Sequence, residues 1–239
     1  MSQSLASYPC LDPETEKLRN SLLPLYQRLA DIESGKREFG GFIEASELPK
    51  NFNMSVDEYP RLQMNFTQAE LETLTDYAKL NAAELLAKVS TPLERLIIAV
   101  VWKNGDLQKV RHIAEGLGYG LGRSVVMDKN TPGPVFRQFG QHLAAPAQQP
   151  IADQHTLRAY RIHRDDCADD KAHLKDISTG SEIASYVAWV QKISGDQLSQ
   201  DRLYGFDQSM FALGRATKKV LSSPHRKKSA KQPLATGGG

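Results

Sequence analysis

Apolar residues recur every three or four positions along most of the chain, which is the spacing of amphipathic α-helices. Residues 12–34 show this spacing first, and Pro24 inside them predicts a kink or a break in the helix. The same spacing predicts helices over residues 135–143, 154–163 and about 200–221. Alternation with a period of two, which would indicate half-buried strands, is almost absent.

Three Thr-x-x-Glu segments mark places where helices begin. Each pairs a threonine with a glutamate three positions later: Thr67 with Glu70, Thr91 with Glu94, and Thr179 with Glu182. In such a capping box the hydroxyl accepts from a first-turn amide, and the glutamate accepts from the amide of the capping residue. The helix that begins near Thr67 is expected to carry one apolar face, formed by Leu71, Leu74, Tyr77, Leu80, Leu85 and Leu86.

The helix that begins near Thr91 is apolar on nearly every side between residues 96 and 102. A helix of this kind normally lies in the centre of a protein, so we expect it to be buried. The next helix is predicted over residues 107–116. The glycine-rich stretch 116–122 is interpreted as a helix end and a flexible turn, because it lacks the strand and the spacing of a dinucleotide fingerprint.

These patterns together predict an all-α fold of about eight helices in a single domain over residues 1–221. Residues 125–127 are the only segment with a strand-like pattern, and they are too short to build a sheet. Asp207 and Arg215 interrupt the apolar face of the last helix, and we interpret them as solvated charges. Residues 222–239 have almost no large apolar side chains, so we expect them to be a disordered tail.

Charge is distributed unevenly along the 239 residues. Residues 1–207 carry 23 basic and 28 acidic residues, a net charge of −5, whereas the rest of the chain has seven basic residues and no acidic one. This excludes a generally basic, histone-like body. The tail is expected to solubilise the protein or to contact a polyanion through three neighbouring bases, Arg226, Lys227 and Lys228.

Other classes of protein are disfavoured by what the sequence lacks. No apolar run approaches the roughly 18–20 residues of a membrane-spanning helix, and Cys10 and Cys167 have no disulfide or metal spacing. We therefore expect a cytoplasmic protein without a cofactor. His155 and His163 are eight positions apart, about 12 Å along a helix, which is too far for one metal ion.

The densest group of polar residues on a predicted helix lies at 153–161. Asp153 follows a proline-containing loop and stands where a helix cap would stand, facing backbone amides and the positive end of the helix dipole. Both effects are expected to keep it ionised. Arg158 and Arg161 follow within two turns and can meet phosphates or nearby acids. A structural cap with ion-paired arginines explains the same pattern.

Residues 150–158, with the sequence PIADQHTLR, resemble the segment that carries the catalytic aspartate in helix-hairpin-helix DNA glycosylases. The pattern of that family is approximately P-x-x-D-x-H-v-x-R at the start of a helix. A proline–glycine turn precedes this segment in the family, and here Gly133 stands 20 positions before Asp153. The resemblance covers about residues 131–164, and the family is all-α.

The resemblance implies that Asp153 assists hydrolysis of the bond between a base and its sugar in DNA. It implies further that DNA is contacted by the hairpin and by the helix that Asp153 begins, through Gly133, Val135, Arg137, His155, Arg158 and Arg161. An extruded base would stack on one of four aromatic residues, Trp102, Tyr119, Phe136 or Trp189.

The hairpin departs from the family's usual L-P-G-v-G, because Pro134 follows Gly133 and has no amide to donate. Bifunctional members carry a lysine that is absent here, and Arg137 cannot replace it as a nucleophile. The resemblance therefore implies a monofunctional, water-using enzyme without an iron–sulfur cluster. The alternative is a noncatalytic helical protein that binds another protein or nucleic acid, which the acidic body favours.

Overall fold

The structure is a computed structural model that describes residues 5–6, 8, 12–44, 46–52, 66–123, 132–164 and 178–222. Those residues contain nine α-helices, two short 3₁₀ helices and no strand, which confirms the all-α prediction. The strand-like residues 125–127 and the tail from residue 223 onward, with Arg226, Lys227 and Lys228, lie outside the described residues.

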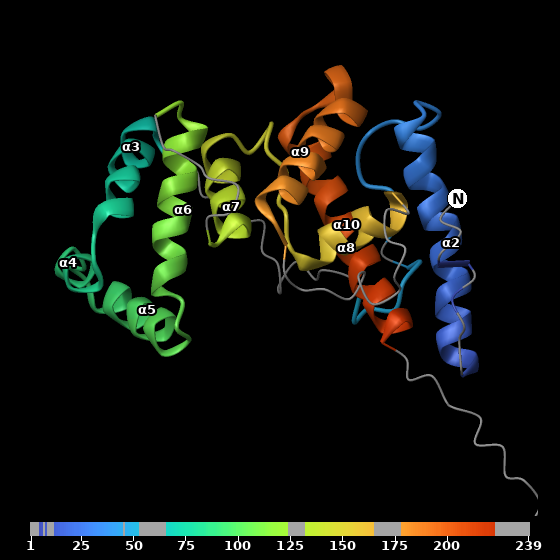
Figure 1. Ribbon diagram of the computed structural model, residues 1–239, viewed down its shortest axis with the longest axis horizontal. Coiled ribbons are helices and arrows are strands. Elements are labelled where there is room, and N and C mark those ends of the chain that lie inside the picture. The colour runs from blue at the N-terminus through green and yellow to red at the C-terminus, as the bar shows by residue number, and fades with distance from the viewer. Residues whose placement is uncertain are drawn as a thin grey trace, which may run out of the picture.

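Nine α-helices follow one another along the described parts of the chain. In order they are α2 (Pro13–Glu33), α3 (Gln68–Asp76), α4 (Ala82–Ala87), α5 (Pro92–Lys103), α6 (Leu107–Gly120), α7 (Pro134–Ala144), α8 (Gln154–Arg164), α9 (Gly180–Ser194) and α10 (Gln200–Leu221). Figure 1 shows α3 to α7 on one side of the molecule and α2 with α8 to α10 on the other. Helix α7 packs on α6 and also contacts α9, so it joins the two groups.

Helix α2 runs unbroken through Pro24, so the break that the sequence allowed does not occur. Asp12 caps the helix by accepting the amide of Thr15 at 2.8 Å. One face of α2 is buried against α8 and α10. Since tertiary packing supplies most of the stability of a protein helix, it compensates for the hydrogen bond that Pro24 cannot donate.

The predicted capping boxes are present, two of them in full. The Thr67 amide donates to Glu70 at 2.7 Å, and the Glu70 amide donates to the Thr67 hydroxyl at 3.3 Å. Thr91 and Glu94 make the same exchange at the start of α5. Thr179 caps α9, but the carboxylate of Glu182 turns toward α8 instead of completing the box.

The single apolar face expected after Thr67 is divided among three elements. Helix α3 ends at Asp76, a 3₁₀ turn (Tyr77–Lys79) follows, and α4 begins only at Ala82. The cause is a fourth capping box that the sequence analysis missed. The Asn81 amide donates to Glu84 at 2.8 Å, and the Glu84 amide donates to the Asn81 side chain at 3.0 Å.

Helix α5 is not the buried central helix that its composition predicted. The side chains of Leu93, Leu96, Ile97 and Val100 are between 53% and 65% exposed. Helix α5 lies at the outer edge of its group and packs against α6 (Figure 1). A helix that is apolar on every side can be buried, but its sequence does not ensure that other helices pack against all of its sides.

The glycine-rich stretch does not end α6, which continues to Gly120. A Cβ atom on Gly116 would lie 2.0 Å from the carbonyl oxygen of Arg137, and one on Gly140 would lie 2.1 Å from that of Ile113. Both distances are far below any real contact, so only glycine permits this approach. The glycines therefore bring the backbones of α6 and α7 together, and the interpretation as a flexible turn was wrong for Gly116 and Gly120.

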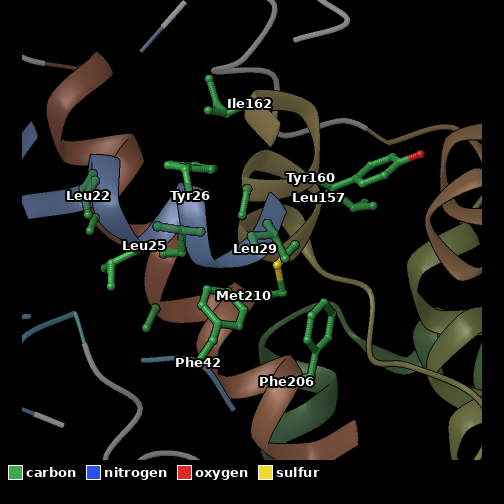
Figure 2. Packing of buried hydrophobic residues seen from close by; sticks show 14 of the residues in the cluster. Leu22, Leu25, Tyr26, Leu29, Phe42, Leu157, Tyr160, Ile162, Phe206 and Met210 are labelled. Atoms are coloured by element: carbon green, nitrogen blue, oxygen red, sulfur yellow. The ribbon is translucent and has the colours of Figure 1, made fainter. Parts of the chain in front are cut away.

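Helix α10 forms the centre of the second group, and the face that its sequence predicted is fully buried. Leu203, Phe206 and Met210 have no exposed surface. Figure 2 shows Phe206 and Met210 close to residues from α2 and α8, among them Leu29. Burying each such side chain contributes about 1.5–3 kcal/mol. None of the helices within the described residues combines the length and the apolar character needed to cross a membrane.

The contrast between α10 and α5 predicts different costs for the same substitution. Leu203→Ala removes a fully buried side chain and is expected to lower the free energy of unfolding by about 2–5 kcal/mol. Leu96→Ala removes a side chain that is 61% exposed, so a change within about 0.5 kcal/mol is expected. Denaturant unfolding of both variants checks this. Equal losses would contradict the exposed position of α5.

Candidate functional site

Asp153 caps α8 as its position in the sequence predicted. Its Oδ1 accepts the amide of His155 at 2.6 Å and that of Thr156 at 2.8 Å. The Thr156 hydroxyl in turn accepts the Asp153 amide at 2.8 Å. These bonds fix the carboxylate at the positive end of the helix dipole.

The surroundings of Asp153 act on its charge in opposite directions. Burial raises the pKa of Asp153 above its usual value. The amides of His155 and Thr156, the Thr156 hydroxyl and the charge of Arg158 lower that pKa, but burial prevails. The net direction is opposite to the one expected from the cap alone. A carboxylate with a raised pKa is a stronger base, which suits it to take a proton from water.

Burial of the first turn of α8 results from a very close approach by α10. A Cβ atom on Gly214 would lie 1.9 Å from the carbonyl oxygen of His155, so only glycine fits there. One turn earlier, the ring of Phe211 meets the His155 imidazole edge-on, with 4.9 Å between the ring centroids. The backbone of α10 therefore lies directly against the residues that the Asp153 side chain caps.

This approach brings a second carboxyl group to the site. Asp207 stands seven positions before Gly214, two helical turns away on the same side of α10. Its Oδ2 accepts the amide of Ile151 at 2.9 Å, in the loop that leads to Asp153. Asp207 is only 4% exposed. The interpretation of Asp207 as a solvated charge was therefore wrong.

Tyr186 of α9 adds a hydroxyl group to the same buried region. Tyr186 lies near enough for the charges of Asp207 and Asp153 to raise its pKa, which burial already raises strongly. Neither Tyr186 Oη nor Asp207 Oδ1 makes a hydrogen bond of good geometry, although both atoms are buried and the two side chains lie near enough to shift each other's pKa. Unpartnered buried polar atoms are costly and rare, and they often mark sites with a chemical function.

The two carboxyl groups oppose each other's ionisation. Burial raises the pKa of Asp207 well above its usual value and the charge of Asp153 raises it further, while the Ile151 amide and the Tyr186 side chain lower it. Asp153 keeps some exposure, whereas Asp207 lies deeper. When two like charges share a buried site, the first negative charge makes the second costly. The arrangement can therefore hold one charge and one proton.

The hairpin residues are organised by an internal ion pair. Gly133 is the capping residue of α7 and adopts a φ of +76°, and a Cβ atom there would clash with the ring of His112. Arg137 is buried, donates to Glu115 Oε2 at 2.8 Å and also binds the Pro132 carbonyl oxygen. Val135 packs against the core. Arg137 thus holds the turn in place from inside.

The predicted cationic residues of α8 also lie inside the protein. Arg158 is fully buried, and its guanidinium lies 3.0 Å from the His155 ring. The structure therefore brings Asp153, His155 and Arg158 together. Arg161 is placed apart from them, where it donates to Glu182 of α9 at 2.9 Å.

The four aromatic candidates for base stacking differ in their exposure. Trp189 is buried and donates to Glu33 at 3.1 Å, so it belongs to the core. Tyr119 is exposed, and Phe136 lies beneath the Lys109 ammonium at 4.9 Å. The side chain of Trp102 lies outside the described part of the structure.

Asp153 does not line the hollow beside the start of α2. This hollow has a volume of about 660 Å³ and is lined by residues that include Leu18, Phe52 and Lys219. In the part of the chain that the structure describes, no three His, Cys, Asp or Glu side chains are arranged to hold a metal ion.

The chain matches no protein-family model, no curated protein and no solved structure.

The close approach at Gly214 predicts the effect of adding one methyl group. Gly214→Ala places a Cβ atom 1.9 Å from the His155 carbonyl, so α8 and α10 must separate, and the free energy of unfolding should fall by about 1–3 kcal/mol. Gly205→Ala on the same helix is the control, because its nearest contact, the Gly41 amide nitrogen, is 3.2 Å away. Equal unfolding midpoints for the two variants would contradict the close approach.

Proposed function

We propose that this chain is a monofunctional DNA glycosylase that hydrolyses the N-glycosidic bond of an extruded base. The observation that carries the proposal is the position of Asp153. It is held by two amides at the start of α8, is partly buried, and has a raised pKa beside a second buried carboxyl group. The resemblance of residues 150–158 to the catalytic segment of helix-hairpin-helix glycosylases supports the same assignment.

In the proposed reaction the target base leaves the stack, because the glycosidic bond is inaccessible inside a duplex. As the bond between sugar and base breaks, its electrons leave with the base and the sugar becomes cationic. The Asp153 carboxylate stabilises that cation and accepts a proton from water, whose oxygen forms the new bond to the sugar carbon. The proton then passes to the departing base, so the products are a free base and an abasic site.

The other residues around Asp153 have supporting roles in this proposal. Arg158 is buried beside His155, and its positive charge favours the ionised form of Asp153. Arg137 is paired with Glu115, so its side chain would not bind a DNA phosphate. The backbone amides at the start of α7, at Gly133 and Val135, would hold the phosphate instead. The bases Arg226, Lys227 and Lys228 would add phosphate contacts from the tail.

A noncatalytic binding function is the second candidate, and a specific observation favours it. Arg137, Arg158 and Arg161, which the resemblance assigns to DNA, are all buried and bonded within the protein. With a net charge of −5 over residues 1–207, the body then has no net positive charge to attract a DNA backbone. Such a protein would bind its partner through other surfaces and release no base.

The substitution Asp153→Asn separates these functions. Asparagine caps a helix about as well as aspartate, so stability and DNA binding should change little. It removes the charge that stabilises the cationic sugar, so base release should fall by about a hundredfold or more, equivalent to roughly 2.7 kcal/mol in the barrier. Asp153→Ala should also lose about 1 kcal/mol of stability, because the cap is gone.

The measurement pairs melting curves with base release from a panel of duplexes that contain damaged or modified bases. Gln154→Ala, at the exposed neighbour of Asp153, is the matched control and should change neither quantity. Wild-type protein that binds these duplexes but never produces an abasic site would support the noncatalytic function instead.

A further inference from the structure

Asp207 joins α10 to the loop that positions the catalytic candidate. Its Oδ2 is the acceptor for the Ile151 amide at 2.9 Å, two residues before Asp153. Gly214, two turns further along α10, sets the distance between this helix and α8. The loop is therefore held at one end by Asp207, and its other end is the capped turn of α8.

The surroundings of Asp207 favour a neutral carboxyl group. The side chain is 4% exposed, so water cannot solvate a charge there. The titratable and charged groups around it are Asp153 at the start of α8 and Tyr186 of α9, and neither one carries a positive charge. Oδ1 makes no hydrogen bond of good geometry, although the nearby Tyr186 side chain lowers the pKa of Asp207 somewhat, whereas an ionised carboxylate normally accepts several such bonds.

We propose that Asp207 is a positioning residue for Asp153: as a neutral carboxylic acid it holds Ile151 in place and leaves Asp153 as the single ionised carboxyl group of the site. A second negative charge beneath Asp153 would compete with it for the positive end of α8 and for the charge of Arg158. The inference extends the proposed function, because it explains how Asp153 keeps its charge in a partly buried position.

Two substitutions at Asp207 separate its charge from its hydrogen bond. Asp207→Asn is neutral at every pH and keeps an oxygen that accepts the Ile151 amide. Asp207→Ala is also neutral, but it has no side-chain oxygen to accept the Ile151 amide. At neutral pH the Asn variant should release base at a rate within about threefold of wild type, whereas the Ala variant should lose about tenfold or more in kcat with little change in KM.

The pH dependence gives a readout that a merely structural residue would not change. The protonated form of Asp207 is favoured in the fold, so the stability it contributes is complete below its unfolded pKa of about 3.9 and is lost as pH rises through the higher folded pKa. The melting temperature of wild type should therefore fall relative to Asp207→Asn by about 3 °C or more between pH 5 and pH 9. Asp196→Asn, at an exposed acid, should follow wild type.

Hydrogen exchange at the Ile151 amide tests the contact without any assay of activity. Exchange should be at least about fivefold faster in Asp207→Ala and nearly unchanged in Asp207→Asn. If wild type releases no base, the proposed function fails while melting and exchange still decide the role of Asp207. The inference is overturned if the Asn variant matches the Ala variant in exchange, or if its melting temperature follows the pH dependence of wild type.

Discussion

The backbone contact between Gly214 of α10 and His155 of α8 is the constraint on which the site depends. Because no side chain larger than hydrogen fits between the two helices there, α10 lies against the first turn of α8 and shields part of it from water. The same contact places Asp207 within reach of the Ile151 amide. Glycine has a comparable function in α6 and α7, where Gly116 and Gly140 let two backbones meet. Close helix packing at glycine thus determines both the packing of α7 on α6 and the position of Asp153.

The sequence was sufficient to predict features that depend on neighbouring residues. The capping boxes at Thr67 and Thr91, the bounds of α10 and the cap at Asp153 follow from local hydrogen bonding and apolar spacing, and the structure confirms them. The exposure of α5 was not predictable, because burial depends on which distant elements pack against a helix. The function of Gly116 was missed for a related reason: a glycine that permits contact resembles a glycine that ends a helix until its partner is known.

The sequence contained an indication that Asp207 is buried, and the interpretation of Asp207 as a solvated charge overlooked it. It stands four positions after Leu203 and three before Met210, so the helical period places it on the buried face of α10. A charged residue on a buried face is uncommon without a partner, and that position alone indicated a special environment. What the sequence did not reveal was the partner, since the Ile151 amide lies 56 positions away. Arg137 and Arg158 are also charged residues that are buried, and their partners, Glu115 and His155, were not identified from the sequence.

We infer that Asp153 and Asp207 share one buried environment in which only one of them is readily ionised. The most direct test is a titration of individual aspartate carboxyl groups, followed by carbon NMR on protein labelled at those positions. Asp207 is expected to titrate well above the ordinary aspartate value of about 3.9, and Asp153→Asn is expected to lower the pKa of Asp207 by removing the neighbouring charge. A carboxyl group of Asp207 that titrates near 4 and does not respond to Asp153→Asn would contradict the account.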